Sequence, residues 1–494
     1  MSILLTECND IYFRDLAARL LAINAPVKYI ATIFPELYSK NPVFKKATLL
    51  DERNYHLSDY IENINVGNPN ALSKQDILEN RDLESLYLSI TDRLTFYPKN
   101  VNDRKQRYYE LLLYWKTFLK NNSIGTVIFP RVPHLGYGNI IYVLAKSMGI
   151  KVLIIRETIF DDSILITECY DDFQKVPKTY KSDLTIKELK KQIGNNFDNI
   201  FNKPSQLMQI NSSDNSVAMN SNKQSFMSSL FNMPTIKAAL TMLHNPFERF
   251  VGTPIYMEPP TSWFGYYIMV FKYYLRYQAT LSYYNSISEL VDFKKKYIYM
   301  ALHYQPERTS MPEGGVFENQ RLMIDILAKS LPTGWYLYVK EHPFQFTRTD
   351  IRKMNFRDSH YYYKMKQYSN LKLVSFNVSS QDLIKHCVAS VTITGSTGWE
   401  TLLAKKPVIT FAPSSWYSPC NSCYVVSSLE ECKAAIKIIQ IKSKAEVEKD
   451  VLKYWLYIRN KFIESDPSIE LARVSKRPYD FLINNLADAL IKRI

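Results

Sequence analysis

The chain has 494 residues, more than one ordinary hydrophobic core accommodates, so we expect two domains with additional segments. Its hydrophobic content of 46% and charged content of 22% are typical of a soluble globular protein. The formal net charge of +14 and the pI near 9.1 indicate an anionic partner, which could be nucleic acid, an acidic membrane surface or small anions.

The cysteines and the apolar segments indicate a reducing, cytoplasmic location. The 6 cysteines are scattered along the chain and do not resemble a disulfide framework. The first residues lack the basic and apolar regions of a signal peptide. The most apolar stretch, 263–277, is interrupted by Lys272 and Arg276, so no membrane span is expected.

The first half of the chain contains one clear βαβ pattern. A strand is predicted at 126–130, a helix at 139–148 and a second strand at 151–155, with a loop rich in Pro and Gly after the first strand. A helix between two strands predicts that these strands are parallel. The segment 196–245 is rich in Ser and Asn and is interpreted as a long loop or insertion.

The second half shows a longer α/β alternation. After an aromatic helix at 263–284, the predicted strands are 297–302, 336–339, 390–395 and 407–412, and the predicted helices are 319–331, 382–388 and 396–406. Two further helices are predicted at 445–462 and 477–494. This order predicts an α/β protein with Rossmann-type domains. It resembles the GT-B glycosyltransferases, in which two such domains face each other across a cleft and are followed by C-terminal helices.

The expected domain limits follow from this order. By the resemblance to GT-B enzymes, residues 1–250 would form an N-terminal acceptor-side domain and 251–440 a nucleotide-sugar-binding domain. Residues 441–494 would supply helices that pack back on the N-terminal domain.

Polar residues follow the first strand of the second domain in the stretch LHYQPERTSMPEGG, 302–315. His303, Gln305, Glu307 and Arg308 leave this strand within a few positions. A loop that follows a parallel strand is a place where side chains converge on a ligand. The alternative is a polar surface loop.

Two more stretches fall at strand ends. In LYVKEHPFQF, Lys340, Glu341 and His342 end a strand that Pro343 stops, so these charges either are solvated or meet a ligand. In TITGSTGWE, 392–400, Ser396 or Thr397 is expected to cap the next helix, and a helix N-terminus with hydroxyls suits a phosphate. A simple N-cap is the alternative.

In the first domain, His134 stands in the loop FPRVPHLGYG and is expected to face the cleft from the acceptor side. Other sites are disfavoured. CNSC at 420–423 has no partner for a zinc site, and the chain lacks GxGxxG, P-loop and GxSxG motifs. The lysine-rich segments lack an RNA-module signature, so nucleic acid is not the expected partner.

Together, LHYQPE, YVKEHP and TGSTGWETLLAKKPVITF resemble the capsule polysaccharide biosynthesis family, which includes the bacterial retaining Kdo transferases. The HP motif and the later Ser/Thr motif also resemble those of bacterial GT-B sialyltransferases, which use CMP-activated acidic sugars. The resemblance extends over roughly 297–417 and is faint at 126–168.

The resemblance implies specific residue roles. His342 and Pro343 match the HP motif that contacts the nucleotide, and Ser396 and Thr397 match the motif on the CMP phosphate. Glu307 stands nearest to the Asp of the retaining Kdo transferases and is assigned as catalytic together with His303 and His134. The expected donor-binding residues are Gln305, Arg308, Lys340, His342, Pro343, Thr394, Gly395, Ser396, Thr397 and Glu400.

The function expected from the resemblance is transfer of Kdo or a nonulosonate, such as pseudaminic acid, from CMP to a capsule or other surface glycan. A glycan or lipid-linked glycan would be the acceptor, and the enzyme would work in the cytoplasm or at the inner membrane surface. Because CMP carries one phosphate, no metal and no cofactor are expected. The alternatives are a GT-B transferase with a UDP-sugar or CDP-glycerol donor and a non-catalytic capsule-assembly scaffold.

Overall fold

The computed structural model consists of two compact units. Unit 1 contains the described residues of Met1–Tyr170 and Phe462–Ile494, and unit 2 contains those of Asp171–Ile236 and Ser262–Lys461. The predicted insertion at 196–245 and the predicted boundary near 250 lie outside the described residues. The structure describes residues 2–55, 71–94, 101–158, 160, 162–170, 172–175, 184–193, 263–305, 310–347, 356–466, 475 and 477–494.

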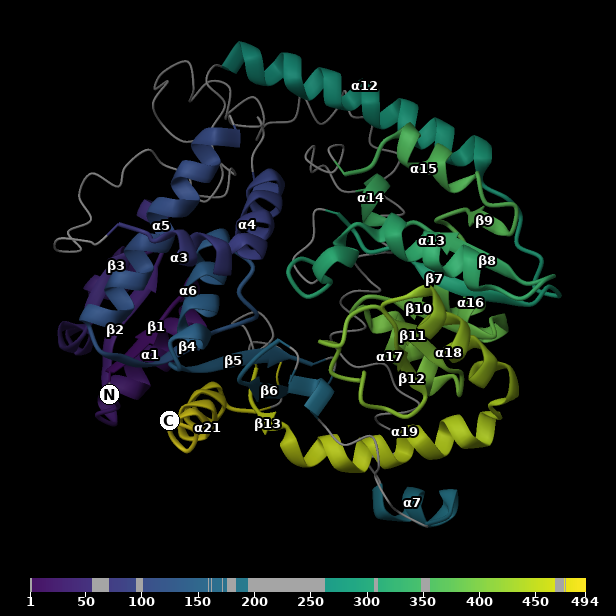
Figure 1. The fold of residues 1–494 in the computed structure, drawn as a ribbon. Coiled ribbons are helices and arrows are strands. Elements are labelled where there is room, and N and C mark those ends of the chain that lie inside the picture. Colours follow the sequence, from purple (N-terminus) through teal and green to yellow (C-terminus); the bar gives the residue numbers. More distant parts are fainter. Residues whose placement is uncertain are drawn as a thin grey trace. The chain divides into compact units, whose positions relative to one another are not determined.

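Unit 1 is built on a seven-stranded sheet of order β13-β6-β5-β4-β1-β2-β3 (Figure 1). Its strands are β1 (Ser2–Leu5), β2 (Val27–Thr32), β3 (Thr48–Asp51), β4 (Ile124–Phe129), β5 (Lys151–Glu157), β6 (Ser163–Thr167) and β13 (Ile463–Glu464). The first five are parallel, whereas β6 and β13 pair antiparallel. The parallel pairing predicted from the βαβ pattern is therefore confirmed in β4 and β5.

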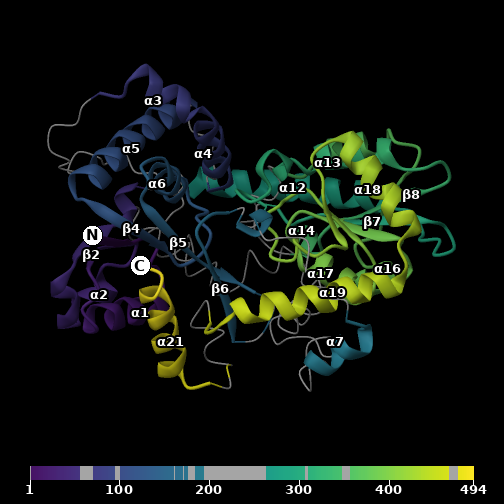
Figure 2. The same cartoon turned by 60° about the horizontal axis from the view of Figure 1, so that its bottom comes forward.

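Helices cover both faces of this sheet (Figure 2). They are α1 (Ile11–Ala22), α2 (Glu36–Ser39), α3 (Lys74–Glu79), α4 (Arg81–Leu94), α5 (Val101–Asn121), α6 (Gly136–Ser147) and α21 (Tyr479–Ile491). α1 starts at Asp10, whose carboxylate accepts the amide N–H of Phe13, and it packs with α21 against the strands through an apolar cluster that includes Leu16 and Leu486. On the opposite face, α4, α5 and α6 pack on one another.

Unit 2 is built on a six-stranded, fully parallel sheet of order β12-β11-β10-β7-β8-β9. The strands are β7 (Tyr297–Ala301), β8 (Tyr336–Lys340), β9 (Leu371–Val374), β10 (Ala389–Thr392), β11 (Val408–Thr410) and β12 (Cys423–Val425). In chain order this is the 3-2-1-4-5-6 arrangement of the Rossmann fold. The expected α/β class with two Rossmann-type units is confirmed, and β9 and β12 are additional strands that were not predicted.

The helices of unit 2 also lie on both sides of its sheet. They are α7 (Ile186–Ile193), α12 (Trp263–Ile287), α13 (Gln320–Ser330), α14 (Phe344–Thr347), α15 (Ser359–Met365), α16 (Ser380–His386), α17 (Ser396–Leu403), α18 (Leu429–Ile441) and α19 (Lys444–Ile458). Apolar side chains of α13 and α18 join the larger core, and those of α16 form a second cluster with Tyr297 and Tyr338. Of the two C-terminal helices, α19 packs on α17 in unit 2 and α21 packs on α1 in unit 1.

The remaining helical turns are short. Single 3-10 turns occupy Pro42–Lys46, Glu52–Tyr55, Asp172–Lys175, Gly315–Glu318 and Arg459–Lys461. In the part of the chain that the structure describes, no helix combines the length and apolar character needed to cross a bilayer.

Candidate functional site in unit 2

The carboxyl ends of β7, β8 and β10 bring the three predicted stretches of unit 2 to one edge of its sheet. β7 and β10 are neighbours, with Met300 paired to Val391, although the chain order of the strands reverses between them. In open parallel sheets this reversal opens a crevice at the carboxyl ends of the strands, where ligands bind. The stretches that begin at His303, Lys340 and Thr394 all leave their strands at this edge.

His303 joins the ends of β7 and β10. Its Nε2 lies 3.0 Å from Thr392 Oγ1 and accepts the amide N–H groups of Ile393 at 3.2 Å and Thr394 at 3.4 Å. A nitrogen that accepts N–H groups carries no proton itself, so the neutral ring has its proton on Nδ1. This geometry favours a positioning role for His303 over the predicted catalytic role.

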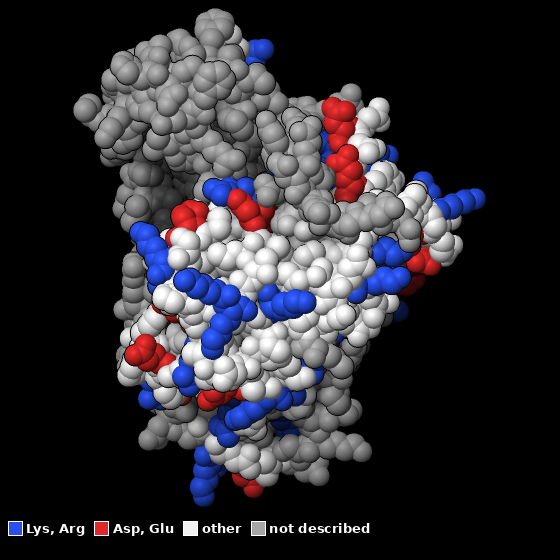
Figure 3. All heavy atoms as spheres, turned by 90° about the vertical axis from the view of Figure 1, so that its left-hand side faces the viewer, with Lys and Arg blue, Asp and Glu red and all other residues white. Residues whose placement is uncertain are grey.

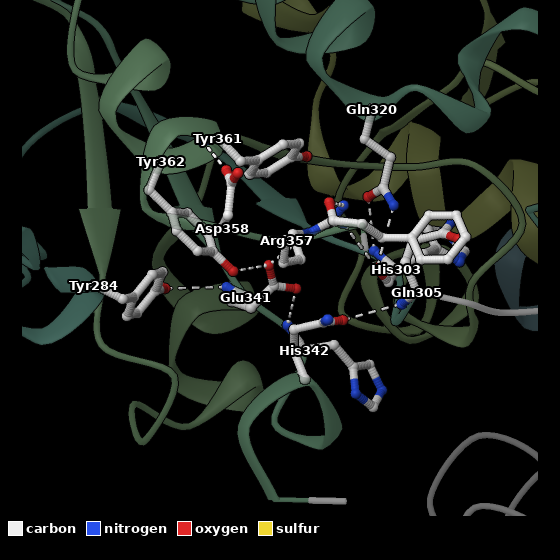
Figure 4. Close-up of polar contacts among 12 residues, drawn as sticks. Tyr284, His303, Gln305, Gln320, Glu341, His342, Arg357, Asp358, Tyr361 and Tyr362 are labelled. Atoms are coloured by element: carbon white, nitrogen blue, oxygen red, sulfur yellow. Dashed lines mark hydrogen bonds and ion pairs between the residues drawn. The ribbon is translucent and has the colours of Figure 1, made fainter. Parts of the chain in front are cut away.

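The backbone of His303 is held as firmly as its ring. Its N–H donates to Gln320 Oε1 at 2.8 Å, and its carbonyl accepts from Gln320 Nε2 at 3.2 Å and from Arg357 Nη2 at 3.2 Å (Figure 4). A glycine is also needed beside the ring, because a Cβ on Gly395 would lie 3.4 Å from His303 Cε1 and 2.9 Å from Thr392 Oγ1. The β7–β10 junction is therefore rigidly built.

Glu341 lies at the centre of a buried network at the end of β8. Its side chain is fully buried at 0% exposure and accepts from Arg357 Nε at 2.9 Å and from the Tyr362 hydroxyl at 2.6 Å. Burial and then the charge of Glu341 raise the pKa of Tyr362, so this hydroxyl remains a donor. Figure 4 shows Arg357 between Glu341 and the His303 loop, which ties the end of β8 to the end of β7.

His342 is oriented by its neighbours. Its amide N–H donates to Glu341 Oε1 at 2.8 Å, and its Nδ1 accepts the amide N–H of Phe344 at 3.1 Å. Because Nδ1 is the acceptor, the neutral ring carries its proton on Nε2. Pro343 stands where the short helix α14 begins, as its lack of a backbone N–H allows. The HP pair therefore presents an Nε2–H donor in a defined direction.

Lys340 lies in a second polar cluster, on the side of the sheet where α16 begins. Its Nζ donates to Ser380 Oγ at 2.8 Å, and its side chain is nearly buried. Burial lowers the pKa of Lys340 to about 8, although the charge of Glu400 acts in the opposite direction. Burial likewise raises the pKa of Glu400, which the hydrogen bond from Ser396 and the charge of Lys340 oppose.

The N-terminus of α17 differs from the expected capping. The N-cap is Gly395 without a side-chain hydrogen bond, and Ser396 Oγ donates to Glu400 Oε1 at 2.9 Å one turn along. The prediction that Ser396 or Thr397 caps the helix is therefore wrong, because both residues already lie within its first turn. The first amide groups of a helix point out of its N-terminus, so this end remains suited to an anion.

Of the three remaining predicted residues in the loop after β7, the structure describes only Gln305. Gln305 is buried, with its N–H donating to Gln345 Oε1 at 3.0 Å and its Nε2 donating to Ser310 Oγ at 2.6 Å. Glu307 and Arg308 lie outside the described residues. Their roles stay predictions.

His134 belongs to unit 1, where it lies in the loop between β4 and α6. Its Nδ1 is 3.5 Å from Glu7 Oε2, a carboxylate that the sequence patterns did not single out. Within the described ranges, no group of three or more His, Cys, Asp or Glu side chains is arranged to hold a metal ion.

Sequence reasoning also missed three residues of the unit 2 site, namely Arg357, Ser380 and Thr392. Ser380 lies 40 residues from Lys340, and Thr392 lies 89 residues from His303. Only Thr392 had a local signal, as part of the stretch TITG at a strand end.

Comparison with known families bears on this site directly. Residues 271–419 match the family model described as capsule polysaccharide biosynthesis protein. The matched segment begins in α12 and extends past β11, so it includes the unit 2 residues discussed above and none of the strands of unit 1. The resemblance predicted from the motifs is confirmed for this segment. No curated protein matches the chain.

Solved structures are similar at low identity. KpsC from Thermosulfurimonas dismutans, a beta Kdo 2,7 transferase, matches with 9% identity and a TM-score of 0.28, over 76% of this chain and 89% of that one. The UDP-GlcNAc 2-epimerase from Methanocaldococcus jannaschii matches with 11% identity and a TM-score of 0.23, over 92% and 100% of the two chains. At such low identities and TM-scores, no activity is inferred from these likenesses.

Proposed function

We propose that this chain, whose segment 271–419 matches the capsule polysaccharide biosynthesis family, is a glycosyltransferase that uses a CMP-activated acidic 3-deoxy-2-keto sugar. The sugar is Kdo or a nonulosonate such as pseudaminic acid. The acceptor is a capsule or other surface glycan, free or lipid-linked, reached at the cytoplasmic side of the inner membrane.

The observation that carries this proposal is the start of α17 at the strand-order reversal of unit 2. Gly395 leaves the helix end open, and Lys340 and His342 stand at the end of the nearby strand β8. An open helix N-terminus, a lysine and an imidazole N–H are the donors that stabilise charge developing on a leaving phosphate. A single phosphate needs fewer such groups than a diphosphate.

The proposal assigns the following roles in the reaction. His342 Nε2–H and the first amides of α17 bind the CMP phosphate, together with the Thr397 hydroxyl and the Ser396 hydroxyl once it turns from Glu400. Lys340 supplies the positive charge that the phosphate neutralises. Glu307 attacks or assists at the anomeric carbon, which gives retention if it acts as the nucleophile. His303, Thr394 and Gly395 shape the crevice around these groups.

The decisive experiment combines nucleotide binding and donor turnover. Thermal-shift measurements with CMP, CDP and UDP should show the largest stabilisation with CMP, and mass spectrometry should detect slow hydrolysis of CMP-Kdo or a CMP-nonulosonate. His342→Ala and Ser396→Ala should lower this turnover by about 100-fold, since each removes a donor to developing charge. The exposed positions His360→Gln and Ser286→Ala are the matched controls.

Four results would speak against the proposal. Full turnover by both folded site variants would remove these residues from catalysis. Stabilisation by UDP alone would favour a UDP-sugar donor, and stabilisation by CDP alone would favour CDP-glycerol. CMP binding without hydrolysis or transfer would leave a non-catalytic scaffold as the better explanation.

A further inference from the structure

The long helix α12 is anchored in unit 2 by its second half. Tyr284 and Ile287 are buried in the larger core of this unit, and Tyr277 packs against that core. The Tyr277 hydroxyl donates to the carbonyl of Phe346 at 2.6 Å, and the Tyr284 hydroxyl donates to the carbonyl of Val374 at 2.6 Å. Apolar burial and two hydrogen bonds therefore fix this half of α12 within unit 2.

The exposed side of α12 changes character along the helix. In the second half it is mainly polar, with exposed Gln278, Ser282, Asn285 and Ser286. In the first half it carries three large apolar side chains, Ile268, Phe271 and Leu275, which are 42%, 57% and 51% exposed. These three are spaced by three and four residues, so they form one stripe along the helix. Ser282 and Ser286 continue the same side about two and three turns after Leu275.

The cations of α12 are not balanced by acids within the helix. Its 25 residues, Trp263–Ile287, include Lys272 and Arg276 but neither Asp nor Glu. Lys272 is exposed and forms no ion pair with any residue that the structure describes, whereas Arg276 lies 3.0 Å from Asp358. Lys272 lies one turn from Ile268 and one turn from Arg276, so the two cations border the apolar stripe.

The packing of unit 2 does not account for this stripe. A single exposed apolar residue is common on protein surfaces, but several on one side of a helix form a patch that is typical of a binding surface. An apolar stripe bordered by cations fits an acidic bilayer, because apolar side chains enter the acyl boundary while Lys and Arg meet the anionic headgroups. The sequence before the stripe includes Trp263, Tyr266 and Tyr267, residue types enriched at membrane interfaces.

We propose that the first half of α12 docks this chain on an acidic lipid bilayer. Ile268, Phe271 and Leu275 enter the boundary between headgroups and acyl chains, and Lys272 and Arg276 contact the anionic headgroups. Two cations beside the apolar stripe suit a helix that lies along the bilayer surface. Because the second half of α12 is fixed in the core, docking of the first half holds unit 2 at the surface. The inference does not depend on the proposed transfer reaction.

A fluorescent label tests whether the stripe enters the bilayer. All 6 cysteines of the chain are buried, so an environment-sensitive NBD group attached to Leu275→Cys reports on this position. Its emission should be that of a water-exposed group in the free protein. It should shift to shorter wavelength with phosphatidylglycerol vesicles at about 50 mM NaCl, where screening is weak. The same label on Ile441→Cys, at a position 84% exposed on α18, is the matched control and should not shift.

Vesicle sedimentation measures how much each part of the surface contributes. The double variant Phe271→Ser, Leu275→Ser should bind phosphatidylglycerol vesicles about tenfold more weakly, because it removes apolar area that the bilayer buries. Lys272→Ala should weaken binding by about fivefold through the loss of one headgroup contact. Ile441→Ser and Lys437→Ala make the same kinds of change at exposed positions of α18 and should bind like wild type.

Several results would overturn the docking role of α12. One is unchanged vesicle binding in the double variant and in Lys272→Ala, with circular dichroism spectra that match wild type. Another is an equal loss in the α18 controls, because lipid would then respond to surface charge and apolar area in general. A label at position 275 that already emits as a buried group without vesicles would show that another part of the chain or a second copy covers the stripe. Hydrolysis of CMP-Kdo without vesicles should be the same in all these variants, so it tests the proposed function separately.

Discussion

At the scale of single residues, the ion pair of Glu341 and Arg357 explains the charge run that ends β8. The two side chains are 0% and 4% exposed, and Arg357 also donates to the carbonyl of His303. Arg, with several donors in one plane, suits a position that must bind a carboxylate and a carbonyl together. The carboxylate of Glu341 is thus buried against Arg357 and is not exposed to solvent. It holds His342 directly and His303 through Arg357.

Removing the charge of Glu341 should destabilise unit 2 strongly. Glu341→Gln leaves the buried Arg357 guanidinium without a counter-charge, and such a loss costs about 3–5 kcal/mol of unfolding free energy. Urea unfolding measures it. Asp358→Asn is the neighbouring control, since Asp358 pairs with Arg276 at 37% and 46% exposure, and it should cost less than about 1 kcal/mol. Equal costs in the two variants would contradict the assigned role.

Lys340 should make CMP binding depend on pH. Its folded pKa of about 8 lies below the ordinary value of 10.5 because the side chain is buried. The phosphate requires the protonated form, so affinity should fall by about tenfold between pH 7 and pH 9 as the lysine loses its proton. Titration calorimetry measures this change. Lys340→Met should bind CMP weakly and without the pH dependence.

Lys340 should also make the free energy of unfolding depend on pH. This free energy should rise with pH, whereas the affinity for CMP should fall. Between pH 8 and 10.5 the unfolded chain binds more protons at this residue than the folded chain, so its contribution to stability increases with pH across this window. Urea unfolding of wild type and Lys340→Met at pH 8 and pH 10 isolates this contribution. A wild-type contribution that fell with rising pH would contradict the burial of an uncompensated charge.

At the scale of elements, the first turn of α17 depends on a glycine and a tyrosine. The buried Tyr417 donates its hydroxyl to the carbonyl of Gly395 at 2.7 Å and thereby holds the helix start. A Cβ on Gly398 would lie 2.4 Å from that hydroxyl and 2.6 Å from the ring carbon that bears it. The position of this helix start thus depends on a close approach that only glycine allows.

Gly398→Ala should displace this helix start. Overpacking against Tyr417 should cost about 1–3 kcal/mol and abolish the thermal shift with CMP. Gly149→Ala is the comparison, because Gly149 has a φ of +70° and a Cβ added to it would meet nothing within 4 Å. It should cost about 1–2 kcal/mol through backbone strain alone and leave CMP binding intact. Loss of CMP binding in both variants would mean that general destabilisation is responsible.

At the scale of the whole molecule, the chain carries an excess of positive charge. The face drawn in Figure 3 carries Lys and Arg side chains at many separate points, with fewer Asp and Glu among them. A net charge of +14 creates an attractive potential for anionic glycans, nucleotides and acidic lipid surfaces. Attraction of this kind is long-ranged and weakened by salt.

Association with acidic bilayers should follow from this charge. The full chain should sediment with phosphatidylglycerol vesicles at about 50 mM NaCl and be largely released at about 300 mM, where the screening length is shorter. Vesicles of phosphatidylcholine alone are the control and should retain little protein. Binding that ignored salt, or that was equal for both lipids, would contradict an electrostatic association.

The parts of the fold that could be predicted are those with local signals. The βαβ unit around β4 and the strands β7, β8 and β10 carry runs of apolar residues bounded by Pro, Gly or charges, and each lies within a few residues of its predicted position. The strands β9 and β12 were not predicted: Lys372 interrupts the apolar run of β9, and β12 directly follows the polar residues Asn421 and Ser422. Among site residues, the strand-end positions could be predicted, since parallel sheets present ligands there.

By itself, the sequence determined the α/β class, the Rossmann-type repetition of strand and helix, and the family resemblance of its motifs. All three depend on patterns of residues that are close together in the chain. Only the tertiary structure decided which distant groups meet. Strand order places His303 against Thr392, the chain that follows β8 returns Arg357 to Glu341, and two loops carry Glu7 to His134. No local pattern encodes such pairs, since the free energy that forms them comes from burial and packing between elements far apart in the chain.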